Sequence, residues 1–247
     1  MPFPFPGMAP SICMQPGDPA AVRQLFEQIA PNYDRLNDTL SLGLHRLWKR
    51  QAIAYLAPTP GQRLLDLCCG TGDLALLLAE KVRPGGLVLG LDAAEAPLEL
   101  ARRRAARQPW LNLDWRLGDA LATGLSDGWA DGAVVAYGLR NLADPLAGLG
   151  ELRRLLRPGG RAAVLDFNRP EDPAGLVARF QRFYLRQLVV PLARQADLEA
   201  HYAYLEQSLA RFPTGSEQES LARQAGFKGV HHRPLAGGQM GLLELVA

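Results

Sequence analysis

The chain has 247 residues, of which 48% are hydrophobic and 21% are charged, and its formal net charge is +2. This is the composition of an ordinary soluble globular protein, and no apolar stretch reaches the roughly 18 residues that a membrane span needs. The small net charge and the lack of a basic arm interleaved with aromatic residues argue against nucleic-acid binding.

The proline-rich residues 1–19 have neither the basic start nor the apolar core of a signal peptide, so we expect a disordered tail. The chain has three cysteines, two of which, Cys68 and Cys69, are adjacent. Their spacing fits no disulfide framework, and we expect packing roles for this pair in a reducing, cytoplasmic compartment.

In residues 20–57 the apolar side chains recur at helical spacing, and Pro31 and Gly43 divide the segment. Polar side chains gather in its middle, namely Tyr33, Asp34, Asn37, His45 and Lys49. A solvated surface position for Asp34 and a packing role for His45 are the alternatives to a place in a functional site.

The pattern of residues 64–73, LLDLCCGTGD, predicts a buried strand with Asp66 near its end, followed by a glycine turn. Gly70 and Gly72 would let the chain bend and bring its backbone close to a ligand. The turn lacks the G-x-G-x-x-G spacing that a pyrophosphate needs, and an acid inside it would repel phosphate. We expect Asp73 to cap the helix that follows.

This D-x-x-x-G-T-G-D pattern resembles the first motif of class I S-adenosylmethionine-dependent methyltransferases, whose cofactor is cationic. The resemblance implies that Asp66, Gly70, Thr71 and Gly72 belong to the cofactor site. Cys68 stands where many of those enzymes have their first glycine, so we expect a less tight turn there.

Strand-like and helix-like segments alternate from here on, separated by short glycine and proline turns. This alternation predicts an α/β protein with a parallel, doubly wound sheet and helices on both faces. The predicted strands are 63–67, 87–91, 113–117, 132–137 and 161–167, the predicted helices are 73–81, 97–107 and 146–156, and residues 157–160 form a turn.

Two acidic residues follow the second and third predicted strands, where a doubly wound sheet binds its ligand. Asp92 is placed to accept hydrogen bonds from both ribose hydroxyls, and the alternative is a helix N-cap. Asp119 could accept the adenine amino group while the Ala120 N–H meets a ring nitrogen. The alternative for Asp119 is a simple turn residue.

The fourth strand ends in AYGLRN, residues 136–141. We expect Tyr137 to lie beside the reactive end of the cofactor, with Arg140 and Asn141 following it into the pocket. YGLRN resembles the (F/Y)GLRN signature of the ubiquinone/menaquinone biosynthesis C-methyltransferases, and so does the opening segment 26–49.

The end of the chain, 201–227 and 235–241, is similar to the cyanobacterial and plastid branch of that family, which methylates 2-phytyl-1,4-naphthoquinol to phylloquinol. The resemblance implies one domain, 20–247, with the class I Rossmann-like fold and S-adenosylmethionine as cofactor. It further implies a helical N-terminal lid, 20–57, and a helical insertion over the substrate site, 174–212.

A quinone ring is electrophilic, so the methyl acceptor must be the reduced quinol, made nucleophilic by loss of a phenolic proton. Arg140 is the candidate that stabilises the phenolate or holds a water that takes the proton, with Asn141 orienting it. Tyr33 would lean toward the sulfonium or the ring. The alternative for Arg140 is an ion pair with Asp66 or Asp92 that only braces the loop.

Residues 176–195 are apolar with interspersed arginines, which suits a lipid-tailed substrate and peripheral contact with an anionic membrane surface. A core helix with a wet arginine face is the alternative. His231 and His232 have no acid or cysteine at ligand spacing, so we expect no metal.

Two other functions stay open at the level of sequence. One is the same chemistry on demethylmenaquinol or a ubiquinol precursor, and the other is a non-catalytic assembly protein of quinone biosynthesis. The oligomeric state is not predicted.

Overall fold

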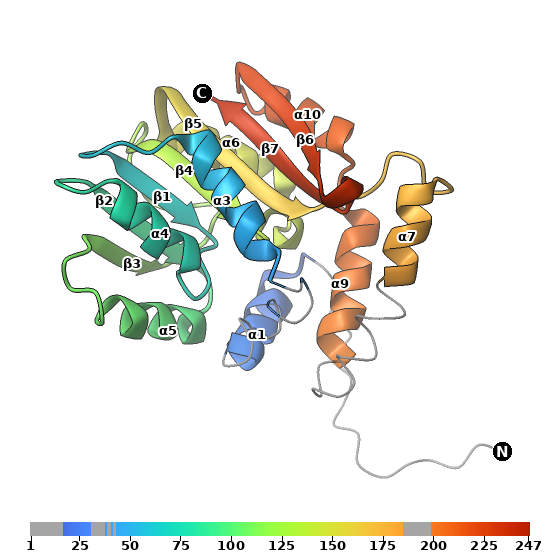
Figure 1. Cartoon of the computed structure of the whole chain (residues 1–247), viewed down its shortest axis with the longest axis horizontal. Coiled ribbons are helices and arrows are strands. Elements are labelled where there is room, and N and C mark those ends of the chain that lie inside the picture. The colour runs from blue at the N-terminus through green and yellow to red at the C-terminus, as the bar shows by residue number, and fades with distance from the viewer. Residues whose placement is uncertain (1–16, 31–37, 39–40, 42, 185–198) are drawn as a thin grey trace, which may run out of the picture.

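Seven strands form one mixed sheet in the order β3-β2-β1-β4-β5-β7-β6 (Figure 1). The structure, a computed structural model, describes residues 17–30, 38, 41, 43–184 and 199–247. Strands β1 to β5 run parallel to one another, whereas β7 is antiparallel to both β5 and β6. The predicted α/β class and the doubly wound, mostly parallel sheet are confirmed.

The elements have the following bounds. The helices are α1 (Pro19–Ile29), α3 (His45–Leu56), α4 (Asp73–Lys81), α5 (Glu95–Ala105), η2 (Leu139–Asn141), α6 (Pro145–Leu155), α7 (Leu176–Tyr184), α9 (Glu199–Arg211), α10 (Gly215–Gln224) and η4 (Ala236–Gly238). The strands are β1 (Arg63–Leu67), β2 (Leu87–Asp92), β3 (Leu113–Leu117), β4 (Ala130–Ala136), β5 (Leu156–Phe167), β6 (Gly229–Leu235) and β7 (Met240–Val246).

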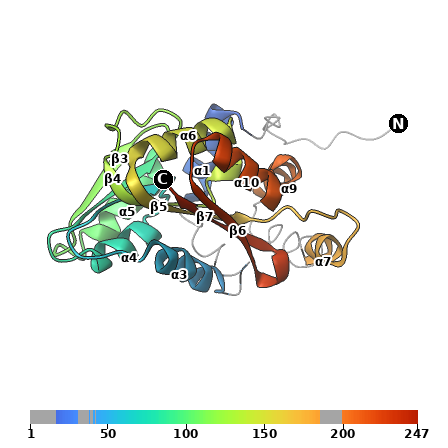
Figure 2. The ribbon, with the colours of Figure 1, turned by 90° about the horizontal axis from the view of Figure 1, so that it is seen from above.

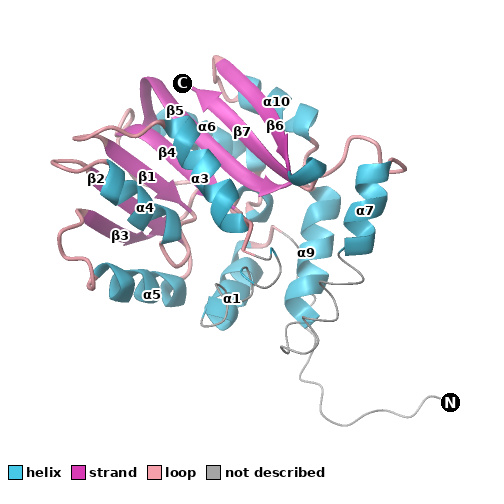
Figure 3. Ribbon diagram, in the orientation of Figure 1, coloured by secondary structure: helices cyan, strands magenta, loops and turns pink. Residues whose placement is uncertain are grey.

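Helices cover both faces of the sheet (Figure 3). Helices α3 and α4 lie on one face and α6 and α10 on the other, as the view from above shows (Figure 2). Their buried side chains belong to the two core clusters on these faces. The central strands are therefore apolar on both sides, which explains why β1 reads as a nearly continuous hydrophobic run. Among the buried residues of β1, Asp66 is the polar exception.

Local sequence signals fix where several helices begin. Asp18 and Asp144 are the N-caps of α1 and α6, and each is followed by a proline at the first helical position. Thr214 and Glu217 form a capping box at the start of α10. These caps are made by residues next to each helix start, so the sequence alone marks where the three helices begin.

The start of β5 differs from the prediction. The strand begins at Leu156, which we expected to end a helix, and the predicted turn 157–160 lies within its bounds. Ala130 pairs with Leu156 and Gly132 pairs with Arg161, so the register shifts between the two pairs. Residues 157–160 therefore bulge out of the ladder instead of separating a helix from a strand.

The helices α1 and α9 lie beyond the carboxyl ends of the parallel strands, and α7 lies at the edge of the molecule (Figure 1). Helices α7 and α9 both belong to the segment between β5 and β6. Within the described residues, no helix is both long and apolar enough to cross a membrane.

Candidate functional site

A pocket opens at the carboxyl ends of β1, β2 and β4 and in the loop after β3. Most of the predicted site residues line it, namely Asp66, Gly70, Thr71, Asp92, Asp119, Ala120, Tyr137 and Asn141. Gly72 and Arg140 are not among the lining residues, and Tyr33 lies outside the described part of the chain. The sheet topology thus brings together residues that are up to 75 positions apart, since the set runs from Asp66 to Asn141.

The turn after β1 has a left-handed backbone at three positions. The φ angle is 60° at Cys68, 53° at Gly70 and 81° at Gly72. The expected loosening at Cys68 is wrong, because the cysteine itself adopts the left-handed conformation, which a side chain disfavours. Space beside Gly70 is open, whereas a Cβ on Gly72 would lie 2.5 Å from the ring of Trp115. Gly72 therefore packs closely against Trp115 of the sheet, and its place in the cofactor site stays a prediction.

Asp92, at the end of β2, is fixed by backbone donors. The N–H of Gly70 donates to its Oδ2 at 2.8 Å and the N–H of Ala94 donates to its Oδ1 at 3.0 Å. Burial raises the pKa of this carboxyl although those N–H groups oppose the shift. The N-cap of α5 is Ala94, so Asp92 is not the cap residue. Each carboxylate oxygen keeps a second acceptor position for a ligand hydroxyl.

Asp66 ties β1 to the first turn of α4. Its Oδ2 accepts a hydrogen bond of 2.8 Å from the N–H of Ala75, which belongs to that turn. The side chain is buried, and burial raises the pKa of the carboxyl to about 7, while the hydrogen bond and the charge of Lys49 act in the opposite direction. Asp66 is therefore only partly ionised near neutral pH and responds to any charge that enters the pocket.

We expected Asp73 to cap α4, and this prediction is wrong. The N-cap residue is Gly72, and no side chain makes a capping hydrogen bond there. Asp73 instead forms a charged cluster with Lys49 of α3 and Arg104 of α5. Lys49 Nζ donates to Oδ2 at 2.9 Å and Arg104 Nη1 donates to Oδ1 at 2.8 Å. Burial raises the pKa of Asp73, but the two cations outweigh it and the pKa lies below its ordinary value.

Asp119 and Ala120 lie in the loop after β3. Asp119 Oδ1 accepts a hydrogen bond of 2.8 Å from the N–H of Leu121, so this carboxylate also shapes its own turn. Both residues line the pocket, with Ala120 almost fully buried. Contact with an adenine ring stays a prediction for the pair.

Arg140 is buried behind the pocket and paired with Asp166 of β5. Its Nε lies 3.0 Å from Asp166 Oδ1, and the two side chains are only 6% and 3% exposed. The guanidinium also lies over the ring of Phe167, 5.6 Å from its centroid. The partners named in the bracing alternative, Asp66 and Asp92, are wrong: Asp66 is bonded to α4, and Asp92 lies two strands from β4. The bracing interpretation holds for the ion pair, with Asp166 as partner.

Asn141 connects this ion pair to the pocket. Its Oδ1 accepts hydrogen bonds from Arg140 Nη1 at 2.7 Å and from the hydroxyl of Tyr204 at 3.0 Å. Its Nδ2 donates to the carbonyl of Tyr137 at 2.9 Å. Tyr137 has a φ of 60°, so the chain leaves β4 in a strained conformation that this network holds. Neither Tyr204 nor Asp166 was among the predicted site residues.

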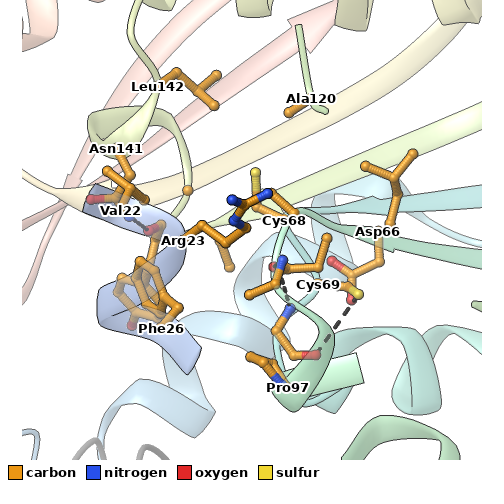
Figure 4. Close-up of a pocket in the computed structure, with 18 of the residues that line it drawn as sticks. Val22, Arg23, Phe26, Asp66, Cys68, Cys69, Pro97, Ala120, Asn141 and Leu142 are labelled. Atoms are coloured by element: carbon orange, nitrogen blue, oxygen red, sulfur yellow. Dashed lines mark hydrogen bonds between the residues drawn. The ribbon is translucent and has the colours of Figure 1, made fainter. Parts of the chain in front are cut away.

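Helix α1 covers the pocket. Val22, Arg23 and Phe26 line it, and Arg23 extends toward the middle of the cavity (Figure 4). Glu27 accepts hydrogen bonds from the N–H groups of Glu95 at 2.6 Å and Ala96 at 2.9 Å, which attaches α1 to the start of α5. Helical periodicity had indicated only that the apolar face of α1 is buried.

Among the described residues, no group of three histidine, cysteine or acidic side chains could hold a metal ion. His232 is half-buried, and burial lowers its pKa. Cys68 and Cys69 are free thiols whose pKa values burial raises.

The donor set of the pocket fits a cationic ligand. Among the described residues that line it, four are carboxylates, namely Asp66, Asp73, Asp92 and Asp119. Carboxylates attract a sulfonium or ammonium group and accept from ribose hydroxyls, whereas they would repel a pyrophosphate. The residues present therefore fit S-adenosylmethionine and not a dinucleotide.

Comparison with known proteins agrees with this interpretation. The profile of the ubiE/COQ5 methyltransferase family matches residues 14–243. A 2-phytyl-1,4-naphthoquinone methyltransferase from Synechococcus elongatus is 49% identical over 230 residues, which cover 93% of this chain and 98% of the relative. The chloroplastic enzyme of the same activity from Arabidopsis thaliana is 42% identical, over 90% of this chain and 85% of its own.

Solved structures of low sequence identity share the fold. A SAM-dependent methyltransferase from Aquifex aeolicus superposes with a TM-score of 0.60 at 17% identity, covering 93% of this chain and 98% of its own. One from Thermotoga maritima has a TM-score of 0.62 at 19% identity, covering 91% and 99%.

Proposed function

The chain belongs to the ubiE/COQ5 methyltransferase family and is an S-adenosylmethionine-dependent methyltransferase, and we propose that it methylates a ring carbon of 2-phytyl-1,4-naphthoquinol to give phylloquinol. The observation that carries the choice of substrate is the identity of 49% to a full-length relative of that activity. The acidic pocket at the carboxyl ends of the strands supports the choice of cofactor.

Residues at the ends of different strands would bind different parts of the cofactor. Asp92 would accept from the ribose hydroxyls, Asp119 and Ala120 would contact the adenine, and Asp66 with the turn at Gly70 and Thr71 would face the amino-acid end. Tyr137 would close the site from the end of β4. When bound, S-adenosylmethionine supplies a methyl group activated by its positive sulfur.

Arg140 is the residue that we propose stabilises the phenolate of the acceptor. Two of its three guanidinium nitrogens are held, Nε by Asp166 and Nη1 by Asn141. Among the described residues, Nη2 makes no hydrogen bond, so it is the donor left for a phenolic oxygen or a bound water. A cation fixed in this way lowers the cost of the negative charge that develops on the ring oxygen.

Two further segments of the chain would cover the pocket. We propose that residues 20–57 form the lid of a single domain, 20–247, because α1 lines the pocket and is attached to α5 through Glu27. We propose that 174–212 cover the substrate, because Tyr204 of α9 contacts Asn141. The proposed role of Tyr33 near the reacting groups lies in the part of this lid that the structure does not describe.

A lipid-tailed substrate suggests contact with a membrane surface, and α7 is the element that would make it. Leu176 is 81% exposed and Phe183 is 59% exposed, and helical spacing puts both on one face. Arg179 and Arg182 lie on the same short helix, so it joins an apolar face to positive charge, as interfacial helices do. The rest of the apolar segment, 185–195, lies outside the described residues.

Vesicle sedimentation tests this contact. The protein should bind vesicles that contain anionic lipid and bind neutral vesicles less well, and the double variant Leu176→Ser and Phe183→Ser should lose most of the binding. Leu77→Ser, at an exposed leucine of α4, is the control and should bind like the parent. Equal binding by the double variant would contradict a role for α7.

The substrate is tested by incubating the purified protein with S-adenosylmethionine and a chemically reduced acceptor, followed by mass spectrometry of the quinone. The gain of one methyl group should be fastest for 2-phytyl-1,4-naphthoquinol. A higher kcat/KM for demethylmenaquinol or a ubiquinol precursor would reassign the substrate. Cofactor binding without transfer to any quinol would favour the assembly-protein alternative.

A further inference from the structure

Lys49 is a buried cation in the wall of the pocket. It lies on α3, its side chain is only 10% exposed, and it lines the same cavity as Asp66, Gly70 and Thr71. A buried lysine is costly unless its ammonium is paired. The contact that compensates it is the hydrogen bond of 2.9 Å to Asp73.

That contact does not use the full capacity of the ammonium. A lysine has three N–H donors, and among the described residues Asp73 Oδ2 is the one acceptor of Lys49. The other oxygen of Asp73 is taken by Arg104 at 2.8 Å. Two cations therefore share one carboxylate, and the cluster keeps a charge of about +1 beside an otherwise acidic cavity.

The position of the cluster indicates which part of a ligand it would meet. The ends of β2 and the loop after β3 carry Asp92 and Asp119, the residues proposed for ribose and adenine. Asp73 is instead the first residue of α4, the helix that follows β1, and Lys49 of α3 is bonded to it there. An extended ligand with its nucleoside at β2 and β3 must place its other end at β1, because β1 is the next strand of the sheet.

We infer that Lys49 binds the α-carboxylate of the amino-acid end of the cofactor. The inference rests on the proposed binding of S-adenosylmethionine and assigns a residue to the one anionic group of that molecule. The acidic lining would repel this carboxylate, so the site needs a cation that is held in place. Asp73 and Arg104 hold Lys49 there without neutralising it.

Calorimetry with two probes tests the inference on the full-length protein. S-adenosylhomocysteine carries the α-carboxylate, whereas 5′-methylthioadenosine has the same nucleoside and sulfur without the amino-acid group. Lys49→Met should weaken S-adenosylhomocysteine binding about tenfold or more and change the affinity for 5′-methylthioadenosine less than about twofold. Lys49→Arg, which keeps the charge, should recover most of the loss.

Two control variants complete the design. Lys81→Met removes an exposed lysine at the end of α4 and should bind both probes like the parent. Arg23→Met removes the other cation of the described lining, which projects from α1. Equal weakening of both probes by Lys49→Met, no weakening of either, or a selective loss in Arg23→Met alone would overturn the assignment.

Failure of the underlying proposal looks different. A parent protein that binds neither probe would contradict the cofactor site itself, and the assignment of Lys49 would fall with it. If Lys49→Met does not fold, as judged by its melting temperature, Lys49→Gln keeps a polar group at this position. The ratio of the two probe affinities then decides the question in the same way.

Discussion

The two ends of the pocket are built differently. At the cofactor end, Asp92 is held by Gly70 and Ala94, which belong to the turn after β1 and to the residues directly after β2. At the acceptor end, Arg140 is held by Asp166, 26 positions away, and Asn141 is held by Tyr204, 63 positions away. The first end depends on two adjacent βα turns, whereas the second depends on β5 and on α9.

This difference suggests a division of labour. A site made by the turns of neighbouring parallel strands is fixed as soon as the sheet forms, so it suits a cofactor common to many enzymes. A site closed by a helix from the segment after β5 can change with that segment, so it suits the selection of an acceptor. Substitutions at the two ends should therefore separate cofactor affinity from turnover.

The largest effect is expected at the acceptor end. Arg140→Lys keeps the positive charge but loses the planar fork, so kcat should fall by about 10²-fold or more while cofactor affinity changes little. Activity should partly recover at high pH, because more of the phenol, with a pKa of about 10, arrives deprotonated. Steady-state kinetics as a function of pH, with calorimetry of the cofactor, make the measurement.

Asp166→Asn is the control for this prediction. It removes the ion pair but leaves the guanidinium, so it should lower the melting temperature and reduce kcat less than Arg140→Lys does. Equal losses of kcat in the two variants, without recovery in alkali, would show that Arg140 only braces the loop.

The next largest effect is expected at the cofactor end. Asp92→Ala removes the carboxylate that faces the proposed ribose position, and S-adenosylmethionine binding should weaken by about ten- to a hundredfold, or roughly 1.5–3 kcal/mol. Asp114→Ala, at an exposed aspartate of β3, is the matched control and should bind normally. An Asp92→Ala variant that folds and binds like the parent would remove this residue from the site.

A smaller effect concerns pH and Asp66, whose pKa burial raises to about 7. A cationic ligand favours the ionised carboxylate, so cofactor affinity should increase about fivefold between pH 6 and pH 8 and then level off. Asp66→Asn should abolish this dependence. A parent profile that is flat from pH 6 to 8 would contradict it.

The raised pKa of Asp66 also affects stability, which should fall with rising pH whereas cofactor affinity should rise. The folded protein holds the Asp66 proton more tightly than the unfolded chain does, so this contribution to the free energy of unfolding is present below about pH 4 and is lost as the pH rises through about 7. In urea titrations the ligand-free protein should therefore lose stability relative to its Asp66→Asn variant, which cannot ionise at this position, as the pH rises from about 4 through about 7.

The smallest effect is expected for Tyr204→Phe, which removes one of the two donors to Asn141 Oδ1. Because Arg140 and Tyr137 still hold Asn141, kcat should fall only about threefold, with unchanged cofactor affinity. Tyr55→Phe makes the same chemical change at a hydroxyl bonded to the Leu245 carbonyl, at 3.0 Å, and should leave kcat unaltered. Equal kcat in both variants would exclude coupling through α9.

The cofactor end could be predicted from sequence because its signals are local. Strand ends, glycines and acids occur together in residues 64–73 and 87–92, and the parallel sheet brings such ends to one edge. The sequence did not predict the contacts of Gly72 and Asp73. Gly72 packs against Trp115, and Asp73 pairs with Lys49 and Arg104, residues that are close in space but distant in sequence.

The position of the acceptor end could be predicted from sequence, but the contacts that hold its residues could not. The string 137–141 indicated where the reacting groups lie, and the family resemblance gave Arg140 and Asn141 their expected roles. The partners Asp166 and Tyr204 were missed, because an aspartate inside an apolar strand and a tyrosine in a helix carry no local signal of contact with a distant loop. The contact of Glu27, on α1, with the start of α5 was missed for the same reason.

The central claim is methyl transfer to a reduced ring, and one measurement tests it most directly. The purified protein is mixed with radiolabelled S-adenosylmethionine and 2-phytyl-1,4-naphthoquinone, with dithionite in one reaction and with the quinone kept oxidised in the other. Label should enter the lipid fraction only in the reduced reaction, because the oxidised ring has no nucleophilic carbon. Equal incorporation in both reactions, with the redox state of each confirmed by its absorbance spectrum, would contradict the account.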